Sequence, residues 1–220
     1  MVVRNPTARV MVPEWVVDHA SFLRWIRSGD VPYGARVAFV RERVWIDTSH
    51  ERFVHNRIKT HLSSTITGIC EDTGEGVYFT DGMLLTTTAG FSTMPDGTYI
   101  RQASCDAGRV RFEGDQKGRD AMELVGVPDL VIEVVSDSSA DEVTAWLTSA
   151  YWNAAIPEYW VVDARVEPLQ FAIYRRRPKG YSRVRTAEGW SRSSVLSRSF
   201  RFVDSGRPAF GRTDYRLEMR

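Results

Sequence analysis

The stretch that decides the fold is Pro-Asp-Leu-Val-Ile-Glu-Val-Val, at residues 128–135. Its last six residues are apolar on both faces of an extended segment, apart from one acidic residue, Glu133. Such a run is typical of a strand that other elements cover on both sides. An ionised carboxylate is costly to bury there unless a metal ion, a cation or hydrogen bonds compensate its lost hydration. The stretch therefore predicts a central strand that carries a buried carboxylate.

Hydrophobic periodicity beyond this stretch predicts a helix and then a second buried strand. Apolar residues recur at helical spacing over residues 141–155, and residues 159–162 form another strongly apolar strand. A strand, a helix and a strand in succession imply a parallel pair within a mixed sheet. By the same patterns we expect further helices over residues 13–28 and 54–66, and strands at residues 36–40, 44–46, 77–79, 83–87, 98–100, 171–174, 181–185 and 200–202.

These elements predict an α/β or α+β fold, in which a mixed β-sheet is flanked by helices and followed by an antiparallel C-terminal run of strands. Residues 101–127 are charged and rich in glycine, so we expect a long excursion there with one weak strand at 109–112. The length of 220 residues suits one compact domain. We expect residues 1–30 to form an N-terminal extension with one helix, and residues 31–220 to form the domain itself.

Several classes of protein are excluded by what the sequence lacks. No apolar run approaches the roughly 18 residues that a membrane span requires. The two cysteines, Cys70 and Cys105, stand far apart and have no partners at metal-ligand spacing. Neither a glycine-rich phosphate loop nor a Gly-x-Ser-x-Gly elbow is present, which argues against a nucleotide cofactor and against serine hydrolysis. We therefore expect a cytoplasmic protein that has no membrane anchor.

Charge is unevenly distributed along the chain. Residues 1–164 contain 15 Lys and Arg against 23 Asp and Glu, whereas residues 165–220 contain 14 against 5. The basic C-terminal quarter is densest at Arg175, Arg176, Arg177 and Lys179. Arginine suits contacts with the phosphates of DNA, because its planar fork donates two hydrogen bonds at once. The alternative is a sheet edge whose charges prevent aggregation, and the sequence leaves both explanations open.

Two carboxylates are candidates for a metal site. No Lys or Arg lies between Arg119 and Arg165, so Glu133 has no cation near it in sequence, which favours metal ligation. The alternative is a structural Glu that accepts backbone hydrogen bonds. Asp96 opens a strand after a Pro-Asp-Gly turn. Two carboxylates on neighbouring strands form an oxygen-rich pocket that suits Mg²⁺, and such an ion can activate water for attack on a phosphate.

Residues 127–139, Val-Pro-Asp-Leu-Val-Ile-Glu-Val-Val-Ser-Asp-Ser-Ser, and residues 154–163, Ala-Ala-Ile-Pro-Glu-Tyr-Trp-Val-Val-Asp, resemble the Uma family of restriction endonucleases. That family is placed in the PD-(D/E)xK nuclease superfamily, and the resemblance runs from about residue 20 to the C-terminus. It implies a restriction-endonuclease-like fold and hydrolysis of DNA with Mg²⁺ or Mn²⁺ as cofactor. By this resemblance Asp96 is similar to the metal-binding Asp, Glu133 to the Glu of the (D/E)xK element, and Asp129 to a supporting carboxylate.

The chain departs from the family at the lysine of the motif. Two positions after the Glu stands Val135, and the following helix, where members of the family often carry the lysine, has no basic residue over 141–147. The lysine normally orients the attacking water and offsets the charge that develops on the phosphate. We expect this charge to come from His55 and Lys59, one helical turn apart on the helix over 54–66, unless both are ordinary surface residues.

Three functions remain open from the sequence. The first is a metal-dependent DNA endonuclease, which the retained Asp96 and Glu133 favour. The second is a catalytically silent relative that binds DNA or protein, which the missing lysine favours. The third is a metal-independent acid–base hydrolase, which needs one carboxylate with a raised pKa. For an endonuclease we also expect a homodimer, because two related sites conveniently cut both strands of a duplex.

Overall fold

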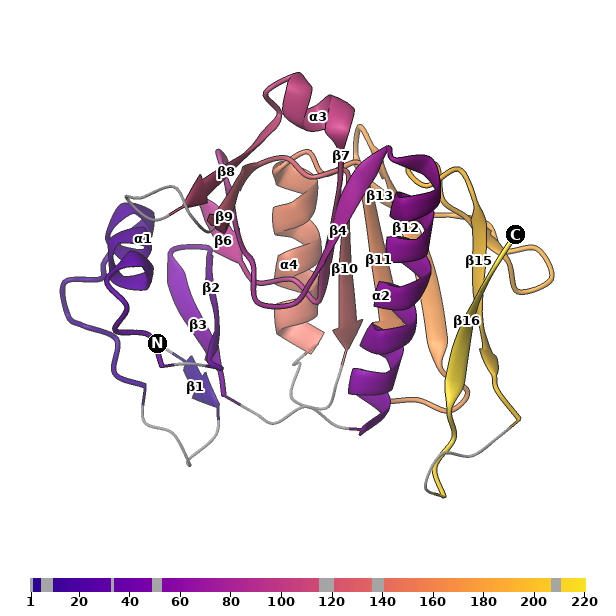
Figure 1. Ribbon diagram of the computed structural model, residues 1–220. Coiled ribbons are helices and arrows are strands. Elements are labelled where there is room, and N and C mark those ends of the chain that lie inside the picture. The colour runs from indigo at the N-terminus through magenta and orange to yellow at the C-terminus, as the bar shows by residue number, and fades with distance from the viewer. Residues whose placement is uncertain are drawn as a thin grey trace.

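The structure is a computed structural model that describes residues 2–4, 10–32, 34–48, 53–114, 121–135, 141–206 and 211–220. Over these residues it contains two large mixed sheets, a three-stranded antiparallel sheet and four helices (Figure 1). The predicted mixture of helices and strands in one α+β fold is confirmed. None of the described helices combines the length and the apolar character that crossing a membrane requires.

The central sheet contains the strand on which the sequence analysis began. Its order is β13 (Gly180–Arg183), β12 (Gln170–Arg177), β11 (Glu158–Asp163), β10 (Leu130–Val135), β7 (Gly97–Arg101) and β4 (Gly76–Thr80). β10 pairs with β11 in parallel, through helix α4 (Asp141–Asn153), and with β7 in antiparallel orientation. The predicted parallel crossover is therefore correct, and β10 is the point where parallel and antiparallel pairing meet.

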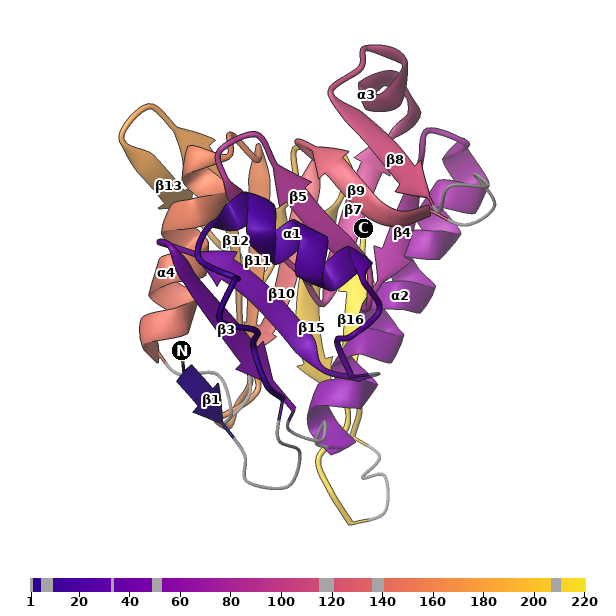
Figure 2. The same cartoon turned by 90° about the vertical axis from the view of Figure 1, so that its left-hand side faces the viewer.

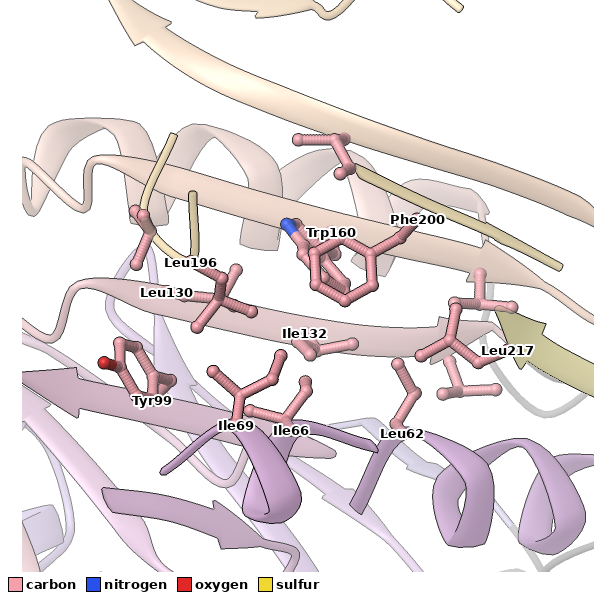
Figure 3. Packing of buried hydrophobic residues seen from close by; sticks show 14 of the residues in the cluster. Leu62, Ile66, Ile69, Tyr99, Leu130, Ile132, Trp160, Leu196, Phe200 and Leu217 are labelled. Atoms are coloured by element: carbon pink, nitrogen blue, oxygen red, sulfur yellow. The ribbon is translucent and has the colours of Figure 1, made fainter. Parts of the chain in front are cut away.

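Both faces of β10 are covered, as its apolar sequence predicts. Alternate side chains of a strand point to opposite faces. On one face Ile132 packs with Leu62 and Ile66 of helix α2 (Phe53–Thr73), and Figure 3 shows Trp160 and Leu217 completing this cluster. On the other face Val131 packs in a second cluster that includes α4. Glu133 lies on the same face as Val131, so its side chain points toward α4 rather than α2.

The second sheet packs on the face of the central sheet that also carries α4 (Figure 2). Its order is β1 (Val2–Arg4), β3 (Arg43–Asp47), β2 (Arg36–Val40), β6 (Phe91–Thr93), β5 (Leu84–Thr87), β9 (Ala121–Gly126) and β8 (Val110–Gly114). Helix α1 (His19–Arg27) buries Phe22 and Trp25 against β2 and β3. α1 is shorter than predicted because the Asp18 carboxylate accepts a hydrogen bond from Ser21 N at 2.7 Å, which caps the helix there.

The weak strand expected at 109–112 is present as β8, but the described part of residues 101–127 contains more regular structure than the sequence predicts. Helix α3 (Gln102–Asp106) follows β7 directly, and β8 and β9 form an antiparallel pair. β9 also pairs in parallel with β5, so the expected single mixed sheet is divided into two. Glu123 is a charged residue within β9, yet it is buried and paired with Arg27 of α1 at 2.6 Å. A cation 96 positions upstream compensates this carboxylate, and no local pattern reveals it.

The C-terminal strands are antiparallel, as predicted, but they divide between two sheets. β12 and β13 extend the central sheet, whereas β14 (Ser191–Arg192), β15 (Ser199–Asp204) and β16 (Tyr215–Met219) form the three-stranded sheet. The two sheets contact each other where Phe200 of β15 packs on Trp160 of β11, with ring centroids 4.8 Å apart. The segment before β15 is held by the buried Glu158, which accepts hydrogen bonds from Ser193 Oγ at 2.5 Å and Ser194 N at 2.8 Å.

Candidate active site

The register of β7 and β10 brings two buried carboxylates into one pocket. Gly97 lies opposite Ile132, so Asp96 is placed beside the next residues of β10. Asp96 Oδ2 accepts a hydrogen bond from Val134 N at 2.7 Å, which fixes the Asp96 side chain against the strand that carries Glu133. Asp96 and Glu133 are both buried and both line the same pocket.

Glu133 is held by a side chain of α4. Tyr151 is fully buried, and its hydroxyl donates a hydrogen bond to Glu133 Oε1 at 2.5 Å. Burial and the negative charge of Asp96 raise the pKa of Glu133 to about 8, although Arg36 and the Tyr151 hydroxyl act to lower it. Burial also works to raise the pKa of Asp96, but the charge of Arg36 and a hydrogen bond with His55 hold that pKa well below its ordinary range. At neutral pH the pair therefore consists of an ionised Asp96 and a protonated Glu133.

Arg36 supplies the cation that the sequence analysis did not find. Its Nη2 lies 2.9 Å from Asp96 Oδ1 and 4.0 Å from Glu133 Oε2, and it donates a hydrogen bond to Met94 O at 3.2 Å. No cation lies near Glu133 in sequence, but a distant one compensates it, so this absence by itself does not favour metal ligation; the cation comes from β2 of the other sheet. In the sequence, Arg36 is recognisable only as the first residue of the predicted strand at 36–40, and this position does not reveal that Asp96 and Glu133 are its partners.

His55 and Lys59 are both buried, so neither is the ordinary surface residue that the sequence left open as the alternative. His55 Nε2 lies 2.9 Å from Val134 O and 3.7 Å from Asp96 Oδ2. Lys59 Nζ lies 2.5 Å from Asp81 Oδ2 and 3.8 Å from Asp96 Oδ1. Both residues belong to α2, so they reach Asp96 from the opposite side of the sheet to Tyr151. They contact Asp96 but do not line the pocket that contains Glu133.

The pocket is small and lies between β2, β3, β10 and α4. Arg36, Asp47, Asp96 and Glu133 provide its charged lining, and Leu147 of α4 provides part of its apolar lining. Its water-accessible volume is about 40 Å³. One water molecule needs at least about 10–15 Å³ of such volume, so the pocket has room for a few waters or for a hydrated ion, but not for a nucleotide.

The donor set of this pocket fits a hard divalent cation that keeps most of its water. Each carboxylate has one oxygen engaged by the fold, by Val134 N and by the Tyr151 hydroxyl, and the other turned toward Arg36. Among the described residues Asp96 Oδ1 is buried and accepts no hydrogen bond. No group of three or more His, Cys, Asp or Glu side chains gathers in the part of the chain that the structure describes. Mg²⁺ is commonly held by one or two carboxylates with water as the other ligands.

Asp129 lies away from this pair. It precedes β10 and stands four residues before Glu133, which corresponds to about 13 Å along a strand. Its Oδ1 lies 2.6 Å from Arg109 Nη2, and its Oδ2 accepts hydrogen bonds from Arg101 N at 2.8 Å and Ser104 Oγ at 2.7 Å. The structure therefore uses Asp129 to tie α3 and the start of β8 to the central sheet.

The basic cluster, Arg175, Arg176, Arg177 and Lys179, lies at the end of the central sheet where β10 begins, away from Glu133. Arg175 stands opposite Glu158, which stands opposite Leu130, whereas Glu133 is near the far end of β10. The β12–β13 hairpin extends beyond that point (Figure 2). Arg177 and Lys179 are exposed. Arg176 is half-buried: it donates to Trp152 O at 3.0 Å and lies over the Trp152 ring. Arg175 is also half-buried. Arg177 and Lys179 are therefore the exposed cations of the cluster.

Gly97 lets β7 pass beneath Tyr78, next to Asp96. A Cβ atom at Gly97 would overlap the Tyr78 hydroxyl. We expect Gly97→Ala to lower the free energy of unfolding by about 1–3 kcal/mol, because overpacking forces side chains and backbone to shift. Chemical denaturation measures this. The matched control is Gly68→Ala on α2, where a Cβ has open space. Equal stability of the two variants would contradict the close packing of Tyr78 on β7.

Known proteins resemble this chain in family and in fold. A family model described as "Uma2: Putative restriction endonuclease" matches residues 20–202. A solved structure, described as a putative nuclease belonging to DUF820 from Anabaena variabilis ATCC 29413, has a TM-score of 0.63 with it at 15% sequence identity. The alignment covers 82% of this chain and 91% of that one. At this identity the likeness is one of fold, and it confirms the predicted fold class. No curated protein matches the chain.

Proposed function

Because the chain belongs to the Uma2 family, described as putative restriction endonucleases, we propose that it is a divalent-metal-dependent nuclease that hydrolyses phosphodiester bonds of DNA. One observation carries the metal dependence. Asp96 and Glu133 lie in one small pocket, and each presents one carboxylate oxygen that the backbone and Tyr151 leave available. Two such oxygens in a pocket with room for water are what a hydrated Mg²⁺ or Mn²⁺ requires.

In this proposal Asp96 Oδ1 and Glu133 Oε2 hold the ion. When bound, such an ion polarises the scissile phosphate and lowers the pKa of its bound water. The chain itself fixes the orientation of both carboxylates. Val134 N holds Asp96, and Tyr151 holds Glu133. Burial and the neighbouring Glu133 raise the pKa of Tyr151 well above its ordinary value, so its hydroxyl remains a donor at all physiological pH values.

His55 and Lys59 act in this proposal as positioning residues for Asp96. They lie 3.7 and 3.8 Å from its two oxygens, and each is held in turn, His55 by Val134 O and Lys59 by Asp81. We assign the exposed Arg177 and Lys179, with Arg175 and Arg176, to outer contacts with the DNA backbone. We also propose residues 31–220 as the catalytic domain with residues 1–30 as its extension, a homodimer as the acting form, and the cytoplasm as the location.

The first experiment is cleavage of supercoiled plasmid and of single-stranded DNA with Mg²⁺ or Mn²⁺, beside EDTA. Glu133→Gln is the test variant. Asp129→Asn is the matched control, because both residues are buried carboxylates of the same segment and only one lines the pocket. We expect metal-dependent cutting that Glu133→Gln abolishes and Asp129→Asn retains per folded molecule. Cutting in EDTA would support metal-independent acid–base hydrolysis, and no cutting of either DNA by folded protein would support the silent binding module.

Metal binding is also expected to stabilise the fold, whether or not DNA is cut. A ligand that binds only the folded state at about 100 times its Kd raises the free energy of unfolding by about 2.7 kcal/mol. We expect Mn²⁺ to do so for the wild-type protein and not for Glu133→Gln, which lacks one of the two ligands. Thermal unfolding with and without Mn²⁺ measures the difference. Equal stabilisation of both proteins would place the metal elsewhere.

A further inference from the structure

Arg36 lines the carboxylate pocket and is the most exposed of its charged side chains. Its side chain is 29% exposed, whereas that of Asp96, 2.9 Å away, is 1% exposed. Met94 O anchors the guanidinium from one side through Nη2. Of the charged groups in the pocket, Arg36 is therefore the one that an anion from solvent can contact most readily. A phosphate diester is the anion that this nuclease must admit, and the planar fork of arginine matches the geometry of two phosphate oxygens.

The charge of Arg36 is permanent, which makes it an electrostatic group and not a proton donor. Burial acts to lower its pKa, but the surrounding carboxylates, Asp96 and Glu133 first among them, hold that pKa above its ordinary value. Lys59 cannot act in the same place, since it lies on the α2 side of the sheet, bound to Asp81, and does not line the pocket. Leu147 of α4 lines the pocket at a position where a lysine side chain would supply a positive charge. Among the described side chains of α4, Thr144 and Leu147 line the pocket, and the sequence of the helix contains no Lys or Arg.

We propose that Arg36 receives the scissile phosphate and thereby takes over the role of the lysine that this sequence lacks. This inference rests on the proposed nuclease function. Before the metal and the substrate arrive, Arg36 neutralises Asp96, so that a divalent ion and the guanidinium compete for Asp96 Oδ1. Arg36 thus opposes metal binding in the free protein and supports the phosphate once it is present. A residue with a merely structural role would support both.

The test uses Arg36→Met, Arg36→Lys, Leu147→Lys and the double variant Arg36→Met/Leu147→Lys. Arg111→Met is the control, because Arg111 is an exposed arginine on β8 whose guanidinium pairs with Glu113 and not with the pocket. We expect Arg36→Met to bind Mn²⁺ about tenfold more tightly in the absence of DNA, since one competing positive charge is gone. Cleavage of DNA in a single turnover should slow by about 100-fold, as for the loss of one preorganised donor.

The double variant restores a cation to the same pocket from the opposite wall. We expect it to recover about tenfold of the lost cleavage rate, and we expect Leu147→Lys alone to weaken Mn²⁺ binding about tenfold. Arg36→Lys should fall between wild type and Arg36→Met, because lysine keeps the charge but not the fork. Circular dichroism identifies folded variants; if Arg36→Met does not fold, Arg36→Lys and Leu147→Lys carry the comparison.

Two outcomes would overturn the inference. Weaker Mn²⁺ binding together with slower cleavage in Arg36→Met would show a structural role, and cleavage at the wild-type rate would remove Arg36 from the phosphate. A failure of the nuclease function is distinguishable, because binding of a 5′-phosphorylated oligonucleotide in EDTA does not require cleavage. Wild type and Arg111→Met should then bind at least about fivefold more tightly than Arg36→Met, and equal binding by all three would reject Arg36 as the phosphate-binding group.

Discussion

Glu133→Gln is expected to abolish DNA cleavage and, in the absence of metal ions, to make the protein more stable at neutral pH. Glutamine keeps an oxygen for the Tyr151 hydroxyl but cannot ionise, and it removes one of the two proposed metal ligands. A buried carboxylate that serves a metal destabilises the metal-free fold, because burial disfavours its ionised form and the group must take up a proton on folding at neutral pH. Loss of activity with a gain in stability is therefore the signature of a functional rather than a structural Glu133.

The stability gain depends on pH in a defined direction. The pKa of Glu133 is about 8 in the folded protein and has an ordinary value of 4.5. Between these pH values the folded state keeps the proton and the unfolded state has released it, so the free energy of unfolding falls as the pH rises, by up to about 1.4 kcal/mol per pH unit. In Glu133→Gln the free energy of unfolding does not fall with pH for this reason, because glutamine does not ionise. Asp96 contributes in the opposite sense, since its pKa is held low, but it is present in both proteins.

Denaturation in EDTA at several pH values measures this effect. We expect the two proteins to be equally stable at pH 4, and we expect the variant to be about 3 kcal/mol more stable at pH 7. Glu113→Gln is a control for the loss of a half-buried glutamate that does not line the pocket. A variant that is less stable than wild type at pH 7 would mean that Glu133 supports the fold through its hydrogen bond with Tyr151, and the functional argument for its burial would be lost.

Asp129→Asn is expected to have the opposite effect: a large loss of stability with no loss of cleavage per folded molecule. The Asp129 carboxylate accepts from Arg101 N and Ser104 Oγ and pairs with Arg109. An asparagine amide turns two N–H donors toward a site that already contains only donors, and it removes the charge that Arg109 faces. Breaking such a buried pair costs about 3 kcal/mol, at the low end of the range because Arg109 is 44% exposed and can be hydrated.

Denaturant unfolding at pH 7 measures the stability of Asp129→Asn, and cleavage is then compared at equal concentrations of folded protein. Asp106→Asn controls for the loss of a nearby exposed carboxylate. If Asp129→Asn folds well and loses its cleavage activity, then Asp129 supports the active site after all, as the family resemblance implied. Together the two variants separate the buried carboxylates of one segment into one that serves the site and one that serves the fold.

Elements whose burial pattern is encoded locally could be predicted from the sequence. The predicted strands at β2, β3, β10 and β11 and the crossover helix are correct, because apolar residues at period 2 or 3.6 determine which face of an element must be buried. The distance between Asp129 and Glu133 was also available from the sequence, since four residues along a strand separate them by about 13 Å. The family resemblance implies that Asp129 supports the site, whereas this spacing along the strand separates it from Glu133.

By itself, then, the sequence determined the central strand, its parallel neighbour, the α+β class and the pairing of Asp96 with Glu133 as candidates. Only the tertiary structure decided what compensates these carboxylates. Arg36 comes from another sheet, Tyr151 from the crossover helix, and Lys59 is buried against Asp81 instead of facing water. The physical reason is that periodicity records only whether a side chain is buried, whereas the free energy of a buried charge depends on its partners, which distant segments of the chain provide.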